Sequence, residues 1–489
     1  MKKSVVAVGV LAVLGGAWVG GAWYTGKMIQ TRIEDGVIAA QSYLDQNTPE
    51  YAAKIKIANY QRSLFSSQVT YTATAGEHTI SIGQKISHGP FPLDHFSLMP
   101  KLAFSTVEFV KQPLLNELFT MTGGKSPVTA ETLIGYNGDS TMKLVVEPMQ
   151  RQTDNNFKFS GLTLDGVGEK NQSISLTSSP LELTSDDVQL MYDTVKIDIT
   201  QTKNKEYSVN GNLGKLTIIE KNIDDENLQA IFNGFSLKSQ IKEGKFGNTG
   251  TSDVALQNIS YTVNNKPVLA FDNLTIANNV QEDDKFVNQT IDTNISQISV
   301  EDKKLGSAAL KINFNQFDGQ ALQFLNKNVN QLTLLMLSDN KSENTDQIMS
   351  NVMTLLDGNP TISISPFSWK NDKGESQIDL SATMMRPASL NARSISQLIF
   401  SAVKQFSSDA KLSVPMMTEV IRVLPSGLSD QEAQDKAAKV VQSWIKIGID
   451  QGILNQQDEN TVTYQFNYTD GTVDLNGQKL PAEQFFRDF

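Results

Sequence analysis

Three histidines, His78, His88 and His95, are the side chains best suited to metal binding or proton transfer near neutral pH. His88 and His95 flank a loop of sequence Gly-Pro-Phe-Pro-Leu-Asp, and Asp94 at its end would add a carboxylate ligand. Two prolines make this loop rigid and extended, and neither a helical His-x-x-x-His pair nor a third histidine stands beside it. A metal site is the alternative, but we interpret the loop as structural, with Phe91 packed, and expect no metal and no cofactor.

Other signatures of catalysis are weak or missing. Residues 123–126, Gly-Gly-Lys-Ser, resemble the end of a phosphate-binding loop, but Phe119 stands where the first glycine is required. Neither the Gly-x-Ser-x-Gly elbow nor the His-Glu-x-x-His zinc helix occurs in the sequence. The chain also has no cysteine, which excludes thiolate nucleophiles, thiolate metal sites and disulfides. We predict no catalytic residues and no enzymatic activity.

The charge balance restricts the classes of partner. The 489 residues carry a formal net charge of −11, and only 19% of them are charged. Nucleic-acid binding requires clustered Lys and Arg to meet the phosphates, and such clusters are missing from the sequence. The composition therefore argues against a nucleic-acid partner and against a polybasic membrane-surface role.

The first 27 residues carry the clearest signal for location. After Lys2 and Lys3 no charged residue occurs between positions 4 and 26, and a helix of this length, about 34 Å, would cross a hydrocarbon core of roughly 30 Å. We predict an uncleaved transmembrane anchor, with the lysines in the cytoplasm and the remaining chain beyond the membrane. The alternative is a cleaved signal peptide, with an apolar region at 5–14 and small residues at 20–22.

Small residues recur on one face of this segment. Ala12, Gly16 and Gly20 are four residues apart, a spacing that lets two membrane helices approach closely. The alternative is that Gly and Ala are simply common in membrane anchors. We expect self-association through these three residues, which we call the anchor dimer face.

Beyond the anchor the sequence predicts an amphipathic helix that ends near Asn47, and then strands. Apolar and polar residues alternate at 54–62, 69–73 and 78–86, and again in many short runs from 128 to 317, each followed by a polar turn. Strict alternation is typical of antiparallel sheet with one wet and one apolar face. The expected fold class is α+β, predominantly antiparallel β, in an elongated region.

Helical periods appear in the last third, at 320–336, 346–356 and 430–449. The last of these begins with a capping-box pattern, Ser429 followed by Glu432, and is expected to bury Val440, Val441, Trp444 and Ile445. The end of the chain is predicted to form a hairpin around Asp470-Gly471. We therefore predict three regions: the cytoplasmic tip and anchor (1–26), a β-rich region (27–317) and a mixed α/β region (318–489).

Short motifs lie in a fixed order along nearly the whole chain, beginning with the anchor segments at 2–10 and 20–27. Their conspicuous positions are Gly, Pro, aromatic and basic residues: Tyr60, Arg62, Phe65, His88, Gly89, Pro90, Phe91, Gly135, Trp369, Lys370, Gly374, Gly471, Asn476 and Gly477. With these motifs the chain resembles the YdgA-like proteins of Gram-negative bacteria. The resemblance implies a self-associating periplasmic protein, anchored in the inner membrane by a single span, whose biochemical function is uncharacterised. It brings no catalytic residues, and residue types of this kind suit tight turns and packing corners.

Three functions compete on this reading. The first is a non-enzymatic envelope protein whose amphipathic sheet shelters a lipid or another hydrophobic envelope component in a groove. The second is a homodimeric scaffold that holds an envelope protein partner by its sheet edges or helices. The third, a periplasmic hydrolase, lacks the signatures that such chemistry requires.

Overall fold

The computed structural model describes residues 2–47, 52–95, 99–151, 157–169, 173–185, 187–201, 206–221, 226–329, 332, 345–387, 401–424 and 427–488; at residues 2–21, 23, 46, 47, 169, 221 and 486–488 it describes the backbone alone. The chain forms two compact units. Unit 1 contains Met1–Gln201 and Gly211–Lys221, and unit 2 contains Thr202–Asn210 and Asn222–Phe489. These units do not test the region boundaries predicted at residues 26 and 317, which stay a prediction.

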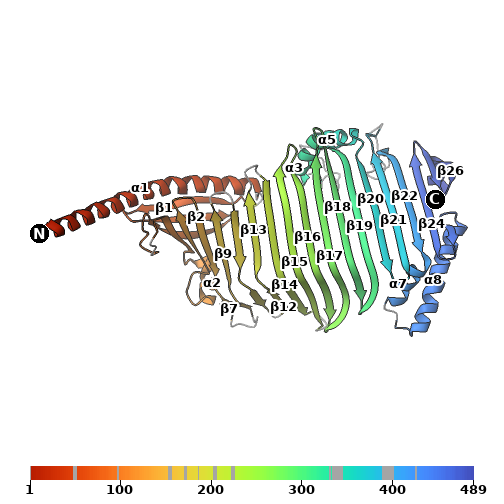
Figure 1. Cartoon of the computed structure of the whole chain (residues 1–489), viewed down its shortest axis with the longest axis horizontal. Helices are drawn as coiled ribbons and strands as arrows, with labels where there is room; N and C mark the ends of the chain where they lie inside the picture. The colour runs from red at the N-terminus through yellow and green to blue at the C-terminus, as the bar shows by residue number, and fades with distance from the viewer. Residues whose placement is uncertain are drawn as a thin grey trace. The chain divides into compact units, whose positions relative to one another are not determined.

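Unit 1 begins with one continuous helix, α1 (Lys2–Asn47), drawn in red in Figure 1. The predicted amphipathic helix that ends near Asn47 is confirmed as its second half. There Ile29 is buried in a cluster with Val69, Ile86 and Ala103 of the sheet. Among helices whose side chains the structure describes, none combines the length and the apolar character needed to cross a membrane.

The end of the predicted anchor segment lies against protein. Ala22 and Thr25 are fully buried, and Thr25 Oγ1 donates a hydrogen bond to the carbonyl of Gly89 at 3.2 Å. Gly26 fits closely beside His88, because a Cβ there would lie 2.5 Å from His88 Cε1. Any membrane-spanning part of α1 therefore has to end before Ala22.

The strands of unit 1 are antiparallel and form two runs of neighbours. The longer run, in pairing order, is β1 (Lys54–Arg62), β2 (Ser66–Ala75), β3 (His78–His88), β4 (Lys101–Phe109), β5 (Val128–Gly135), β6 (Ser140–Val146), β9 (Leu162–Glu169), β10 (Ser173–Ser178) and β13 (Val195–Gln201). The shorter run is β7 (Met149–Gln150), β8 (Lys158–Phe159), β11 (Leu181–Thr184), β12 (Val188–Tyr192) and the second half of β14 (Glu206–Lys221). Between β4 and β5 lie η2 (Pro113–Leu115) and α2 (Asn116–Met121).

Unit 2 is an antiparallel meander in which each strand from β15 to β21 pairs with the next along the chain (Figure 1). Its strands are β15 (Asn227–Glu243), β16 (Asn248–Val263), β17 (Lys266–Glu282), β18 (Phe286–Val300), β19 (Lys303–Asp318), β20 (Thr361–Asn371), β21 (Gly374–Met384), β22 (Val403–Ser413), β24 (Thr461–Thr469), β25 (Thr472–Leu475) and β26 (Gln478–Pro481), with β23 (Asn455–Asp458) beside β24. The expected antiparallel β-rich fold is confirmed.

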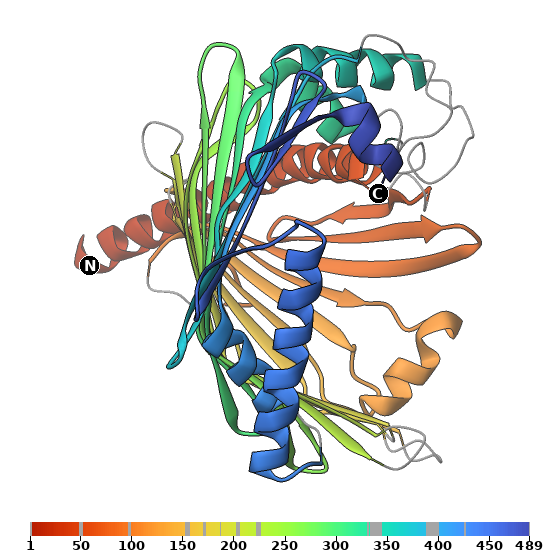
Figure 2. The ribbon, with the colours of Figure 1, turned by 90° about the vertical axis from the view of Figure 1, so that its right-hand side faces the viewer.

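Two helix pairs belong to unit 2 and lie at opposite ends of its strands (Figure 1). One pair is α3 (Gly319–Lys327) with α5 (Thr345–Asp357), and the other is α7 (Val414–Val423) with α8 (Asp430–Asp450). A last helix, α9 (Ala482–Asp488), follows the terminal hairpin. In Figure 2, α7 lies against the strands and α8 lies outside it. The predicted helices at 346–356 and 430–449 are confirmed, whereas the part of 320–336 beyond 329 lies almost wholly outside the described residues.

Candidate functional site

An apolar pocket in unit 2 is the strongest candidate for a functional site. It has a volume of about 250 Å³ and lies between the sheet, α7 and α8. Strands β20 to β22 form its floor, α7 forms one wall, and α8 contributes Trp444. The lining residues are Phe367, Trp369, Ser376, Ile378, Leu412, Met416, Met417, Val420, Ile421 and Trp444, all of them apolar except Ser376.

The floor is apolar because the strand register aligns apolar side chains on one face. Directly paired residues of antiparallel strands point to the same side of the sheet. One row across β19 to β22 is Leu310, Phe367, Ile378 and Ala410, and the next contains Ile312, Ile364 and Leu380. Phe367 is 38% exposed, so helices α7 and α8 leave part of this face open.

Two hydrogen bonds hold the wall, α7, on the sheet, and a third fixes a side chain of the floor. Ser413 Oγ accepts from the Met416 N–H at 3.3 Å and caps the helix, and Asn371 Nδ2 donates to the Met416 carbonyl at 3.3 Å. Trp369 Nε1 donates to the Leu305 carbonyl at 2.8 Å, which fixes the indole beside the pocket. At the end of α7, Val423 is buried against Ile298 and Leu305.

Helix α8 begins as predicted, because the Glu432 carboxylate accepts hydrogen bonds from the Ser429 N–H at 3.1 Å and its Oγ at 2.7 Å. Val441 is fully buried, but Trp444 is 59% exposed, so the expectation that Trp444 is buried is wrong. The helical period identifies the apolar side of α8 without showing how far the underlying layer reaches. Because the pocket lies beneath Trp444, no layer of side chains fully covers its indole ring.

The charged side chains of α7 lie outside the lining of this pocket. Arg422 forms a two-pronged ion pair with Glu419, with nitrogen–oxygen distances of 2.9 and 2.6 Å, on the side of α7 that lines a separate polar hollow. The hydrogen bonds from Arg422 lower the pKa of Glu419 below its ordinary value. Neither residue lines the apolar pocket, and none of the ten lining residues is charged.

The predicted candidates for metal binding are separated in unit 1. His88 is 1% exposed, its Nε2 lies 2.8 Å from Ser67 Oγ, and its Nδ1 lies 3.2 Å from the Leu64 carbonyl. Asp94 instead pairs with Lys85 at 3.1 Å, while the His95 ring stacks on Phe104 with centroids 5.0 Å apart. Among the side chains that the structure describes, no group of three His, Asp or Glu is placed to hold a metal ion.

The buried His88 belongs to a network that joins several motif positions. Because Nδ1 can only donate to the Leu64 carbonyl, Nε2 accepts the hydroxyl proton of Ser67, whose oxygen lies 3.1 Å from Tyr60 Oη. Burial is the main cause that lowers the pKa of His88 below its ordinary value of 6.5. This Ser–His pair is closed to a substrate, since Ser67 is also fully buried.

Other motif positions of unit 1 surround this network. The Phe65 carbonyl accepts from the His88 N–H at 2.8 Å, and the Gly89 N–H donates to the Leu102 carbonyl at 2.8 Å. The Pro90 carbonyl accepts from the Lys101 N–H, the Gly135 N–H closes the turn to Asp139, and Arg62 lies beside Gly26. Phe91 is 42% exposed, so the expectation that it packs in the loop is wrong; the neighbouring Pro92 is the buried residue.

Motif positions of unit 2 lie beside the start of α7, just beyond the end of α8 and in hairpin turns. Lys370 follows Trp369 on β20, and Gly374 starts β21, where a Cβ would lie 2.3 Å from Ser413 Oγ at the start of α7. Asn476 Nδ2 donates to the carbonyls of Gly452 and Ile453, just beyond the end of α8, both at 2.9 Å. Gly471 and Gly477 have φ angles of +75° and +86°, which suit the two hairpin turns.

The anchor dimer face and helix α7 lie beyond what the sequence patterns settle. The anchor dimer face, Ala12, Gly16 and Gly20, lies among residues whose side chains are not described, so the expected self-association stays a prediction. The predicted helices do not include α7, although Ser413 followed by Pro415 is a usual start signal for a helix. Without α7 the pocket has no wall, and the sequence alone could not locate it.

Comparison with known proteins gives one family and three relatives. Residues 1–207 and 169–483 match the model of a family described as bacterial protein of unknown function (DUF945). The chain is 28% identical to protein YdgA of Escherichia coli K12 over 99% of its own length and 96% of that protein, and 24% identical to the uncharacterised protein YihF of the same organism over 98% and 97%. An uncharacterised protein of Haemophilus influenzae is 24% identical over 66% of this chain and 85% of its own. No solved structure gives a significant match.

Proposed function

Because this chain belongs to the DUF945 family of bacterial proteins, in agreement with its YdgA-like motifs, we propose that it is a non-enzymatic envelope protein that binds a hydrophobic envelope component in the pocket formed by α7, α8 and β20 to β22. The family description names no activity, and the described relatives have no enzyme names. The proposal therefore depends on the chemistry of the pocket.

The lining of the pocket is the observation that carries this proposal. Nine of its ten lining residues are apolar, and two of them, Phe367 and Trp444, remain 38% and 59% exposed. Exposed aromatic side chains at an apolar concavity are typical of a surface that binds a partner or ligand. An acyl chain placed there would be stabilised by roughly 25 cal/mol for each Å² of apolar surface removed from water.

We also propose that the protein is held at the inner membrane, with its bulk in the periplasm. Lys2 and Lys3 followed by an uncharged stretch support a single span that ends before Ala22. The continuity of α1 favours an anchor over a signal peptide, since cleavage after Ala22 would cut the helix and remove a buried residue. Such a location would supply lipid to the pocket.

A photoreactive fatty acid tests the proposal on the full-length protein in lipid nanodiscs. After irradiation, mass spectrometry of peptides should find the label on α7, α8 and β20 to β22. Met417→Trp should reduce this labelling about tenfold or more, because the indole would fill the pocket. Leu428→Trp, an equal enlargement at an exposed position outside the lining, is the control and should label as the wild type does. Labelling that ignores Met417→Trp, or is confined to α1, would contradict the proposal.

A further inference from the structure

Trp444 joins the apolar pocket to a second concavity on α8. This second concavity, the α8 hollow, has a volume of about 550 Å³ and is lined by Glu432, Asp435, Lys436, Lys439, Val440, Ser443 and Trp444. Trp444 is the residue that lines both spaces. A molecule bound in the apolar pocket would therefore continue past the indole into a polar environment.

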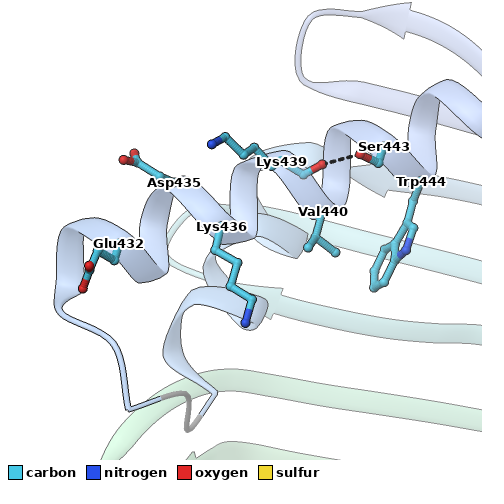
Figure 3. A pocket seen from close by; sticks show the side chains of 7 residues that line it. All are labelled: Glu432, Asp435, Lys436, Lys439, Val440, Ser443 and Trp444. Atoms are coloured by element: carbon cyan, nitrogen blue, oxygen red, sulfur yellow. Dashed lines mark hydrogen bonds between the residues drawn. The ribbon is translucent and has the colours of Figure 1, made fainter.

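The order of side chains along α8 changes from apolar to cationic. Figure 3 shows Trp444, Val440 and Lys436 projecting on the same side of the helix, in a row one turn apart. Lys436 is eight residues from Trp444, which corresponds to about 12 Å along the axis. Lys439, from the adjoining row, lines the same hollow.

The two lysines differ from the carboxylates of the hollow in their partners. Glu432 is engaged in the cap with Ser429, and Asp435 Oδ1 accepts from Gln431 Nε2 at 3.1 Å. The ammonium groups of Lys436 and Lys439 have no hydrogen bond or ion pair with any residue that the structure describes. They are thus available to an anion, whereas the Glu432 and Asp435 carboxylates accept hydrogen bonds from Ser429 and Gln431.

We propose that the ligand of this site is an anionic amphiphile, whose acyl chain occupies the apolar pocket and whose carboxylate or phosphate is bound by Lys436 and Lys439. This inference depends on the proposed function, because it names the class of hydrophobic component. The chain seat is provided by residues such as Phe367, Ile378 and Ile421, and Trp444 covers the carbon atoms next to the head group. A neutral molecule with the same chain would use the pocket without the lysines.

Two photoreactive probes of equal chain length, a fatty acid and the corresponding fatty alcohol, separate these contributions in full-length protein in nanodiscs of neutral lipid. We expect the fatty acid to label the pocket more strongly, and Lys436→Gln combined with Lys439→Gln to reduce its labelling about three- to tenfold, since each exposed charge contact contributes modestly. Labelling by the alcohol should stay unchanged in this double variant. Lys446→Gln, on the same helix but outside both concavities, is the matched control.

The outcomes distinguish the inference from the proposed function. If both probes label the pocket equally and the double variant has no effect, the ligand is not selected by charge, and the inference is wrong while the proposed function stands. If neither probe labels the pocket, the proposed function itself fails. If the fatty acid labels the pocket more strongly, competition with phosphatidylglycerol and with unlabelled palmitate identifies the head group. A loss of labelling at high salt that is seen with the fatty acid and not with the alcohol would support the lysine contacts.

Discussion

At the scale of single residues, exposure separates the side chains that hold this fold from those available to a ligand. His88 is enclosed and satisfied, with Ser67 and the Leu64 carbonyl as its partners. Trp444 is a large apolar side chain that the fold leaves more than half open. The first is explained by packing alone, and the second is open to the ligand that we propose.

The enclosed histidine predicts a pH dependence of stability. The folded state lowers the pKa of His88, while the unfolded state keeps its ordinary value of 6.5, so the unfolded chain binds the extra proton as the pH falls below that value. Stability is therefore complete above about pH 6.5 and declines as the pH falls through the window below it, by at most about 1.4 kcal/mol per pH unit for one group. Urea unfolding of the full-length protein between pH 8 and pH 5 measures this slope.

The slope should disappear in His88→Gln. His78→Gln, at the exposed start of the same strand, should retain it and serves as the control. An unchanged slope in His88→Gln would show that other groups cause the pH dependence.

At the scale of elements, the packing of α1 on unit 1 has a sharp test in two glycines of the same helix. A Cβ on Gly26 would lie 2.5 Å from Cε1 and 2.7 Å from Nδ1 of the His88 ring, which is buried and hydrogen-bonded and cannot withdraw. Gly26→Ala should therefore cost about 1–3 kcal/mol of stability. Gly36, by contrast, is exposed with nothing near its Cβ position, and Gly36→Ala should gain about 0.5–1 kcal/mol from helix propensity.

Thermal unfolding of both variants beside the wild type gives this comparison. Equal effects of the two substitutions would mean that α1 does not pack on the sheet at Gly26.

Sequence patterns predicted most of these elements and little of the site. Alternation placed β1, β2 and β3 correctly, and the Ser429–Glu432 pattern placed the start of α8, because both are local signals. The pocket depends on which residues of β20, α7 and α8 meet, and on Trp444 lying at an edge. Those contacts bring together residues that are far apart in the sequence, such as Phe367 and Trp444, and local periodicity contains no information about them.

At the scale of the whole molecule, the proposed anchor predicts how the protein fractionates. Apolar burial in lipid is insensitive to ionic strength, so the full-length protein should remain in the membrane pellet after washing with high salt. The mass of the intact protein, measured by mass spectrometry, should include the first residues.

The anchor dimer face predicts a dimer that crosslinking captures. Gly16→Ile and Gly20→Ile should weaken this dimer, because a larger side chain holds the two helices apart, while Val13→Ile should not.

A mature protein that begins near Trp23 would rule out the anchor. An unchanged dimer in both glycine variants would rule out the anchor dimer face.

The meander order of unit 2 affects the order in which its strands can pair during synthesis. From β15 to β22 every strand pairs with the strand made immediately before it, and most of the closing loops are short, so their entropic cost is low. The connections from β19 to β20, which contains α3 and α5, and from β21 to β22 are longer. Strands can then add one by one in the order of synthesis. Until the next strand arrives, however, the newest edge has open backbone donors and acceptors and can pair with a foreign strand. Aggregation during biogenesis should therefore be most sensitive to pauses within 227–413, before the terminal hairpin covers the edge of β22.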